Sequence, residues 1–108
     1  MTAPIVITAA GQTATPIVRR AGDARTHNVD CSSLLRPLEL LVRMAAEPVA
    51  GLGMQCEARP ARGARSLDVR IAGGDMPDGR QRADGSVRLV VVTTQGQIEL
   101  ALAVRLIA

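Results

Sequence analysis

The sequence contains no phenylalanine, tryptophan or tyrosine among its 108 residues. Aromatic side chains usually supply much of the buried area of a domain, so the core must be built from Leu, Val, Ile, Ala and Met. These side chains bury less apolar surface each, at about 25 cal/mol per Å². We therefore expect an isolated domain of modest stability that gains from contacts with partner subunits.

Lysine is also absent, so all 13 basic residues are arginine. A GC-rich genome, which favours Ala, Arg, Gly and Val codons together, is the simplest explanation. The net charge of +3 is too small for the strong basic field of a dedicated nucleic-acid binder. The aromatic platform on which single-stranded bases stack is missing as well. Nucleic acid is therefore not the partner we expect.

No apolar run approaches the roughly 20 residues of a membrane-spanning helix. The first residues lack the basic segment of a secretory signal, so we expect the protein to remain in the cytoplasm in which it is made. Cys31 and Cys56 are the only cysteines. Their spacing fits neither a CxxC motif nor a four-ligand zinc site. We interpret them as small hydrophobic residues in a reducing compartment, with a disulfide as the alternative.

The most regular pattern lies at the C-terminal end. Alternate residues are apolar from Val87 to Val91 and again from Ile98 to Leu106. A period of two is typical of a strand with one buried face. Gln95-Gly96 between the two runs suits a tight turn. We predict an antiparallel hairpin over residues 86–106.

Weaker strand signals precede this hairpin. Residues 52–58 and 66–72 predict a second hairpin, and residues 38–46 fit either a strand, which we favour, or a short helix. A single helical turn over 33–36, capped by Asp30 or Ser32, is also compatible with the sequence. We expect residues 73–85 to form a long connection. Six or seven short strands indicate an all-β fold, a small antiparallel immunoglobulin-like β-sandwich.

The first quarter of the chain is the least regular part. Residues 4–8 and 16–19 are short β-branched runs, and residues 19–28 look like a polar loop. We therefore divide the chain into residues 1–28, an N-terminal arm or a pair of edge strands, and a sandwich domain at 29–108.

Residues with catalytic or metal-binding chemistry are sparse. His27, Asp30, Ser32 and Ser33 lie within seven positions of one another, which indicates turn chemistry rather than a convergent triad. The three aspartates of residues 75–84 do not match the spacing of a calcium-binding loop. We predict no catalytic residue, no metal and no cofactor.

The expected contacts are therefore with proteins. The apolar run at the N-terminus can add to a sheet edge as an extra strand, and two arginine-bearing loops, which we expect to form a basic patch at one end of the sandwich, can supply charged contacts. The predicted partner-binding residues are Ile5, Val6, Ile7, Arg59, Arg62, Arg65, Arg80 and Arg82.

Three segments carry a resemblance to a known family. They are residues 29–39, with Val29-Asp-Cys-Ser-Ser-Leu-Leu35 before Pro37-Leu-Glu39, residues 49–52, and residues 67–97, with a strand, two glycines and a Val/Thr-rich hairpin. Together, residues 29–106 resemble small bacteriophage proteins described as fibre-tail adaptors. The sequence departs from that pattern at Cys31 and Leu35, where aromatic residues are common.

The resemblance implies a β-sandwich virion component, assembled in the cytoplasm of the host bacterium, that joins a tail fibre or spike to the tail without catalysis. Its partners would be other virion proteins, and it would form a homo-oligomer within the particle, away from any membrane. A capsid decoration or cement protein is the first alternative. A nucleic-acid-associated binding module that uses the arginine loops is the second.

Overall fold

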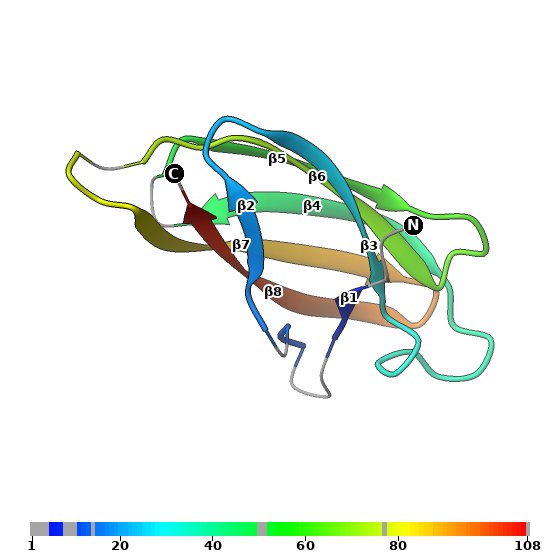
Figure 1. Cartoon of the computed structure of the whole chain (residues 1–108). Coiled ribbons are helices and arrows are strands. Elements are labelled where there is room, and N and C mark those ends of the chain that lie inside the picture. The colour runs from blue at the N-terminus through cyan, green and yellow to red at the C-terminus, as the bar shows by residue number, and fades with distance from the viewer. Residues whose placement is uncertain (1–4, 8–10, 14, 50–51, 77, 108) are drawn as a thin grey trace.

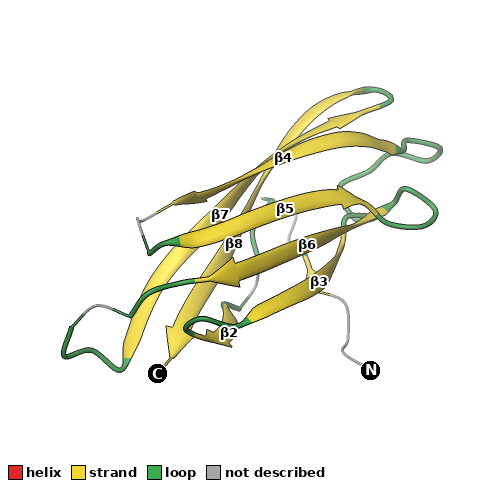
Figure 2. Ribbon diagram, turned by 90° about the horizontal axis from the view of Figure 1, so that it is seen from above, coloured by secondary structure: helices red, strands yellow, loops and turns green. Residues whose placement is uncertain are grey.

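The computed structural model describes residues 5–7, 11–13, 15–49, 52–76 and 78–107. This part of the chain forms eight strands and no helix. The strands make two four-stranded sheets that face each other (Figures 1 and 2). They are β1 (Ile5–Val6), β2 (Ile17–Arg20), β3 (Ala24–Asp30), β4 (Leu41–Val49), β5 (Met54–Pro60), β6 (Ser66–Gly73), β7 (Arg82–Thr93) and β8 (Gly96–Ile107).

The strand order is that of an immunoglobulin-like sandwich. The first sheet has the order β1-β3-β6-β5 and the second has the order β2-β8-β7-β4. Strands β3 to β8 thus take the places of strands B to G in the constant-type immunoglobulin arrangement. The predicted all-β sandwich is confirmed. Two pairings were not expected, because β1 pairs with β3 and β2 with β8 in parallel.

The predicted C-terminal hairpin is the longest pairing of the fold. Strands β7 and β8 are antiparallel over their whole lengths, from Arg82 opposite Ile107 to Thr93 opposite Gly96. The hairpin therefore starts four residues before the predicted residue 86, within the segment expected to be a connection. Polar residues at 82–86 hide this strand from sequence reasoning, because only pairing with the end of β8 holds them extended.

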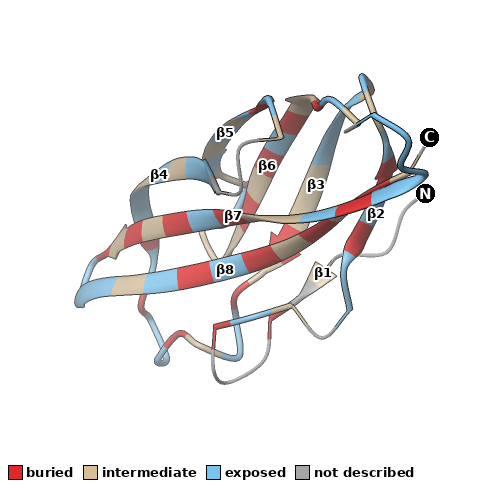
Figure 3. Cartoon of the chain, turned by 90° about the vertical axis from the view of Figure 1, so that its left-hand side faces the viewer, coloured by how far each residue is buried: buried red, intermediate tan, exposed pale blue. Residues whose placement is uncertain are grey.

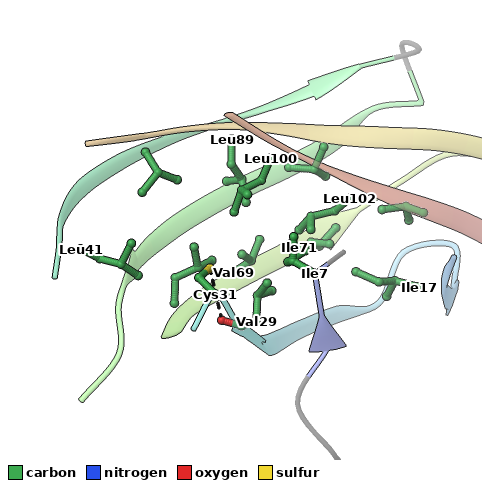
Figure 4. Close-up of a cluster of buried hydrophobic side chains, with 14 of the residues drawn as sticks. Ile7, Ile17, Val29, Cys31, Leu41, Val69, Ile71, Leu89, Leu100 and Leu102 are labelled. Carbon is green, nitrogen blue, oxygen red and sulfur yellow. Dashed lines mark hydrogen bonds between the residues drawn. The ribbon is translucent and has the colours of Figure 1, made fainter. Parts of the chain in front are cut away.

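The core is an aliphatic layer between the two sheets. Buried and exposed residues alternate along β7 and β8, as Figure 3 shows. Side chains from both sheets meet in the middle, among them Val69 and Ile71 of β6 with Leu89, Leu100 and Leu102 of the hairpin (Figure 4). Cys31 and Leu35 are both buried in this layer. The cysteines are free, so the alternative of a disulfide is wrong.

The N-terminal quarter belongs to both sheets. Within residues 1–28, β1 lies at the edge of the first sheet and β2 at the edge of the second, while residues 24–28 belong to β3 inside the first sheet. The expected polar loop over residues 19–28 is wrong, since β2 continues to Arg20 and β3 begins at Ala24 and pairs with β6 as far as Asp30. The first three residues of β3, 24–26, are all exposed, which explains the polar start of this strand. The predicted boundary after residue 28 falls within this strand.

The strand predicted over residues 38–46 exists as β4 but is displaced toward the C-terminus. A bulge between Leu41 and Arg43 breaks the register with β7. The strand continues through Pro48, which an edge strand tolerates because its outer N–H groups need no partner in the sheet. The helical turn considered for residues 33–36 is absent. There, Asp30 Oδ1 instead accepts hydrogen bonds from the Ser32 backbone N–H and hydroxyl at 2.9 and 2.7 Å.

A buried arginine joins the two sheets at one end. The Arg19 side chain extends from β2 of the second sheet and donates to the carbonyl of Gly73 at 2.7 Å and of Ile71 at 3.2 Å, both on β6 of the first sheet. It also donates to the carbonyl of Asp23 in the turn between β2 and β3. Burial lowers the pKa of this guanidinium. The bonds of its two Nη groups offset part of the lost hydration of a side chain that is 4% exposed, while its buried Nε–H has no partner among the described residues.

Truncation of the core should be costly. Leu102 is fully buried, so Leu102→Ala should lower the free energy of unfolding by about 2–5 kcal/mol. Urea denaturation followed by far-ultraviolet circular dichroism measures this, because the chain lacks the fluorophores Trp and Tyr. The matched change Leu38→Ala, at a side chain 90% exposed, should alter stability by less than about 0.5 kcal/mol. Equal losses in the two variants would contradict the described core.

Loss of the buried arginine should also destabilise the sandwich. Arg19→Met keeps most of the side-chain volume but removes the guanidinium bonds to three carbonyls, of which Gly73 and Asp23 keep a backbone donor, and this should cost about 1–3 kcal/mol. The control is Arg20→Met on the same strand, where the side chain is exposed. The same urea titration should show little change in the control, and similar midpoints for both variants would rule out the cross-sheet role of Arg19.

Candidate partner-binding surface

The residues with hydrolytic chemistry do not converge. Asp30 binds Ser32 locally, and these hydrogen bonds lower the pKa of the Asp30 carboxyl. The Ser33 hydroxyl donates to the carbonyl of Ile7 at 3.0 Å. His27 lies half-buried on β3, where burial, reinforced by the charges of Arg19 and Arg25, lowers its pKa. The hydroxyls and the carboxylate thus serve turns and loop attachment.

The acidic side chains of the described residues likewise do not converge on one site. Asp84 accepts from Arg105 Nε at 2.9 Å, and this hydrogen bond lowers the pKa of the Asp84 carboxyl. Among the described residues, no three His, Cys, Asp or Glu side chains are grouped so that they could hold a metal ion. The same ranges contain no helix that is long and apolar enough to cross a membrane.

The two arginine loops lie at opposite ends of a sandwich 48 Å long. The connection from β5 to β6 carries Arg62 and Arg65 at one end, next to Arg59 of β5 (Figure 1). The connection from β6 to β7 carries Arg80 just before Arg82 at the other end. The five predicted arginines therefore cannot form one basic patch.

One of these arginines is used within the fold. The Arg65 guanidinium donates to the carbonyls of Arg36 and Glu39 at 3.2 and 3.0 Å. Arg62 nearby is exposed, and so are Arg59, Arg80 and Arg82. Arg65 thus attaches the connection between β3 and β4 to the connection between β5 and β6.

The N-terminal run is only partly available for strand addition. Ile5 and Val6 form β1 at the edge of the first sheet, but the side chain of Ile7 is 1% exposed and belongs to the core. Pro4 and Thr8, the ends of the predicted strand, lie outside the described residues. Ile7 therefore anchors this segment to the sandwich.

An exposed apolar surface, which sequence reasoning missed, lies at the start of β4. Leu38 is 90% exposed, Leu40 41% and Val42 52%. We call these three residues the apolar loop. Leu40, Val42 and Met44 alternate as they would on one face of a strand, but the bulge separates them, and of the three only Met44 packs against the core. The sequence feature that could have indicated this surface is Glu39, a charged residue between two leucines. In the structure its side chain points inward.

Glu39 is the anchor of the apolar loop. Its carboxylate is buried, and it accepts from the Thr93 hydroxyl on β7 and from the Arg36 backbone N–H at 2.9 Å. The Glu39 N–H donates in turn to the Arg36 carbonyl at 3.1 Å. These bonds turn the carboxylate inward and the neighbouring leucines outward.

Backbone hydrogen bonds join the apolar loop to two further segments of the chain. The Leu40 carbonyl accepts from the Thr94 N–H at 2.9 Å, and the Leu41 N–H donates to the Ala64 carbonyl at 2.7 Å. Leu38 and Ala64 both have positive φ, of 69° and 56°, which is uncommon for residues other than glycine. Such strained conformations persist where the surrounding contacts fix them, and they often accompany function. The apolar loop is therefore a fixed surface that holds its side chains in solvent.

The comparisons with known proteins add no relative. No family model matches the chain, and no curated protein matches it.

Acid should remove the stabilisation that the Glu39 carboxylate gives to the apolar loop. The Thr93 hydroxyl, helped by the Arg36 N–H, lowers the pKa of the Glu39 carboxyl. Because folding lowers this pKa, the carboxylate stabilises the fold above the ordinary range of a glutamate, and that contribution is lost as the pH falls through the lowered pKa. Glu39→Gln should therefore be less stable than wild type at pH 7, and the difference should disappear in strong acid. Urea midpoints across this pH range measure it.

The control for this experiment is Glu57→Gln, at an exposed carboxylate on β5. It should follow wild type at every pH. A stability difference for Glu39→Gln that is independent of pH would contradict the anchoring role of its charge.

Proposed function

We propose that this chain is a non-catalytic structural protein that joins other proteins in an assembly, and specifically a bacteriophage virion adaptor that links a tail fibre or spike to the tail. The observation that carries the proposal is the apolar loop, in which Leu38, Leu40 and Val42 are held in solvent by the bonds of Glu39 and Arg65. The resemblance of residues 29–106 to fibre-tail adaptors supports the choice of assembly.

A protein partner is the occupant that this surface favours. Burial of a leucine or valine side chain contributes about 1.5–3 kcal/mol, and a loop that is already ordered loses little entropy on binding. Exposed Arg36 and Arg62 lie on or beside the same loops and supply the polar rim that surrounds the apolar centre of most interfaces. The partner should therefore offer an apolar pocket with acidic residues around it.

A capsid decoration protein could use the same surface at a higher copy number. This alternative therefore differs from the tail adaptor in where the protein lies in the particle. A nucleic-acid-binding module has less support, because the arginine loops lie at opposite ends and Arg65 is engaged in the fold.

The test is quantitative mass spectrometry of purified particles of the phage that encodes the chain, with tails and capsids separated. We expect the protein in the tail fraction, at a small multiple of the tail symmetry. A triple variant, Leu38→Ser, Leu40→Ser and Val42→Thr, should be depleted from tails by tenfold or more while its circular dichroism spectrum stays native.

The matched control is Val18→Thr, which changes an exposed apolar residue of β2, 56% exposed, on another part of the surface. Its incorporation should equal that of wild type. Recovery with capsids in proportion to the shell protein would make the chain a decoration protein, and absence from all particles would refute both virion roles.

A further inference from the structure

Strand β4 is the longest open edge of the sandwich. The two sheets end at β1, β5, β2 and β4, which have 2, 7, 4 and 9 residues respectively. Figure 2 shows β4 along one flank, with β7 of its own sheet on one side and β5 of the other sheet nearby. An open edge presents backbone groups that can pair with another strand.

The proline identifies which groups point outward. In an antiparallel pair, residues alternate between those that exchange hydrogen bonds with the neighbour and those that point away from it. Pro48 has no N–H and belongs to the second class, together with Met44 and Ala46. Their backbone N–H groups thus point away from β7 and toward the open edge.

The pairing window of this edge is short and symmetric. The bulge between Leu41 and Arg43 interrupts the strand on one side, and Pro48 interrupts it on the other. Residues 43–47 remain, and Ala45 is their centre. A second strand can therefore pair in register only along these residues.

The charges in this window are self-complementary. Arg43, Ala45 and Glu47 are all exposed, and they share one face of the strand because they lie two residues apart. In an antiparallel pair centred on Ala45, Arg43 of one copy lies opposite Glu47 of the other, and the same contact occurs twice. A shift by two residues would place Arg43 opposite Ala45 and remove both ion pairs.

We propose that two copies of this chain pair antiparallel along β4, about a two-fold axis at Ala45, so that their second sheets join into one continuous sheet. Met44 and Ala46 of each copy then donate and accept backbone hydrogen bonds with Ala46 and Met44 of the other. This pairing uses the flank of the sandwich and does not depend on the apolar loop or on the proposed virion role. The interface is small, so the dimer should be weak in solution, in the micromolar to millimolar range.

Disulfide trapping tests the register. Residues opposite each other without hydrogen bonds lie about 4.5 Å apart between Cα atoms, within the range that a disulfide spans. Ala45→Cys, in a Cys56→Ser background, should therefore give a covalent dimer of about twice the 11.3 kDa chain on mild oxidation. Cys31 should not interfere, because burial raises the pKa of its thiol to about 11.

The control is Glu47→Cys in the same background. In the proposed register the two residues at position 47 lie four positions apart along the strands, roughly 13 Å, which is too far for a disulfide. This variant should stay monomeric under the same oxidation. Equal cross-linking of both variants, or none of Ala45→Cys when its circular dichroism is native, would overturn the proposal.

Charge exchange gives a second, independent test with the purified full chain. Arg43→Glu or Glu47→Arg alone places like charges opposite each other, which should weaken self-association roughly tenfold in sedimentation equilibrium followed by interference optics. The double exchange, R43E with E47R, should restore it. Wild type that stays monomeric up to millimolar concentration, or single exchanges without effect, would refute this interface while leaving the proposed virion role untouched.

Discussion

The aliphatic layer between the two sheets is the interaction on which the rest of the structure depends. The inward rows of β6, β7 and β8 supply most of it. Without aromatic rings, the layer depends on many branched side chains that are each fully covered, so the sheets must stay in register with each other. Polar contacts fix that register at both ends, through Arg19 at one and through Glu39 with Arg65 at the other.

The polar contacts also decide what the protein exposes. Glu39 occupies the position that the sequence pattern gives to the surface, and its inward turn places Leu38 and Leu40 outside. Exposed leucines and positive φ at Leu38 and Ala64 both disfavour the folded chain when it is alone. In the proposed assembly, a partner would cover this surface and remove the apolar side chains from water.

The two proposed contact regions lie on different parts of the sandwich and are geometrically compatible. The apolar loop lies at the end where β3, β5 and β7 finish, whereas the self-pairing window lies along the flank. Antiparallel pairing of β4 would point the apolar loops of two copies in opposite directions. A dimer of this form would carry two identical docking surfaces at its far ends, which suits a protein that bridges other components with two-fold symmetry.

Local sequence patterns were sufficient to predict the β-sandwich and its longest hairpin. Both are indicated by alternation of period two and by turn residues, which can be recognised from neighbouring positions in the chain. These patterns failed at β3 and at the start of β7, where polar residues are held extended only by strands distant in the sequence. They also failed at the apolar loop, since the inward turn of Glu39 requires Thr93, which lies 54 positions away. The sequence by itself determined the fold class and most of the core, through side-chain periodicity. The tertiary structure alone decided which apolar residues stay outside, because burial depends on contacts between segments that the local pattern does not contain.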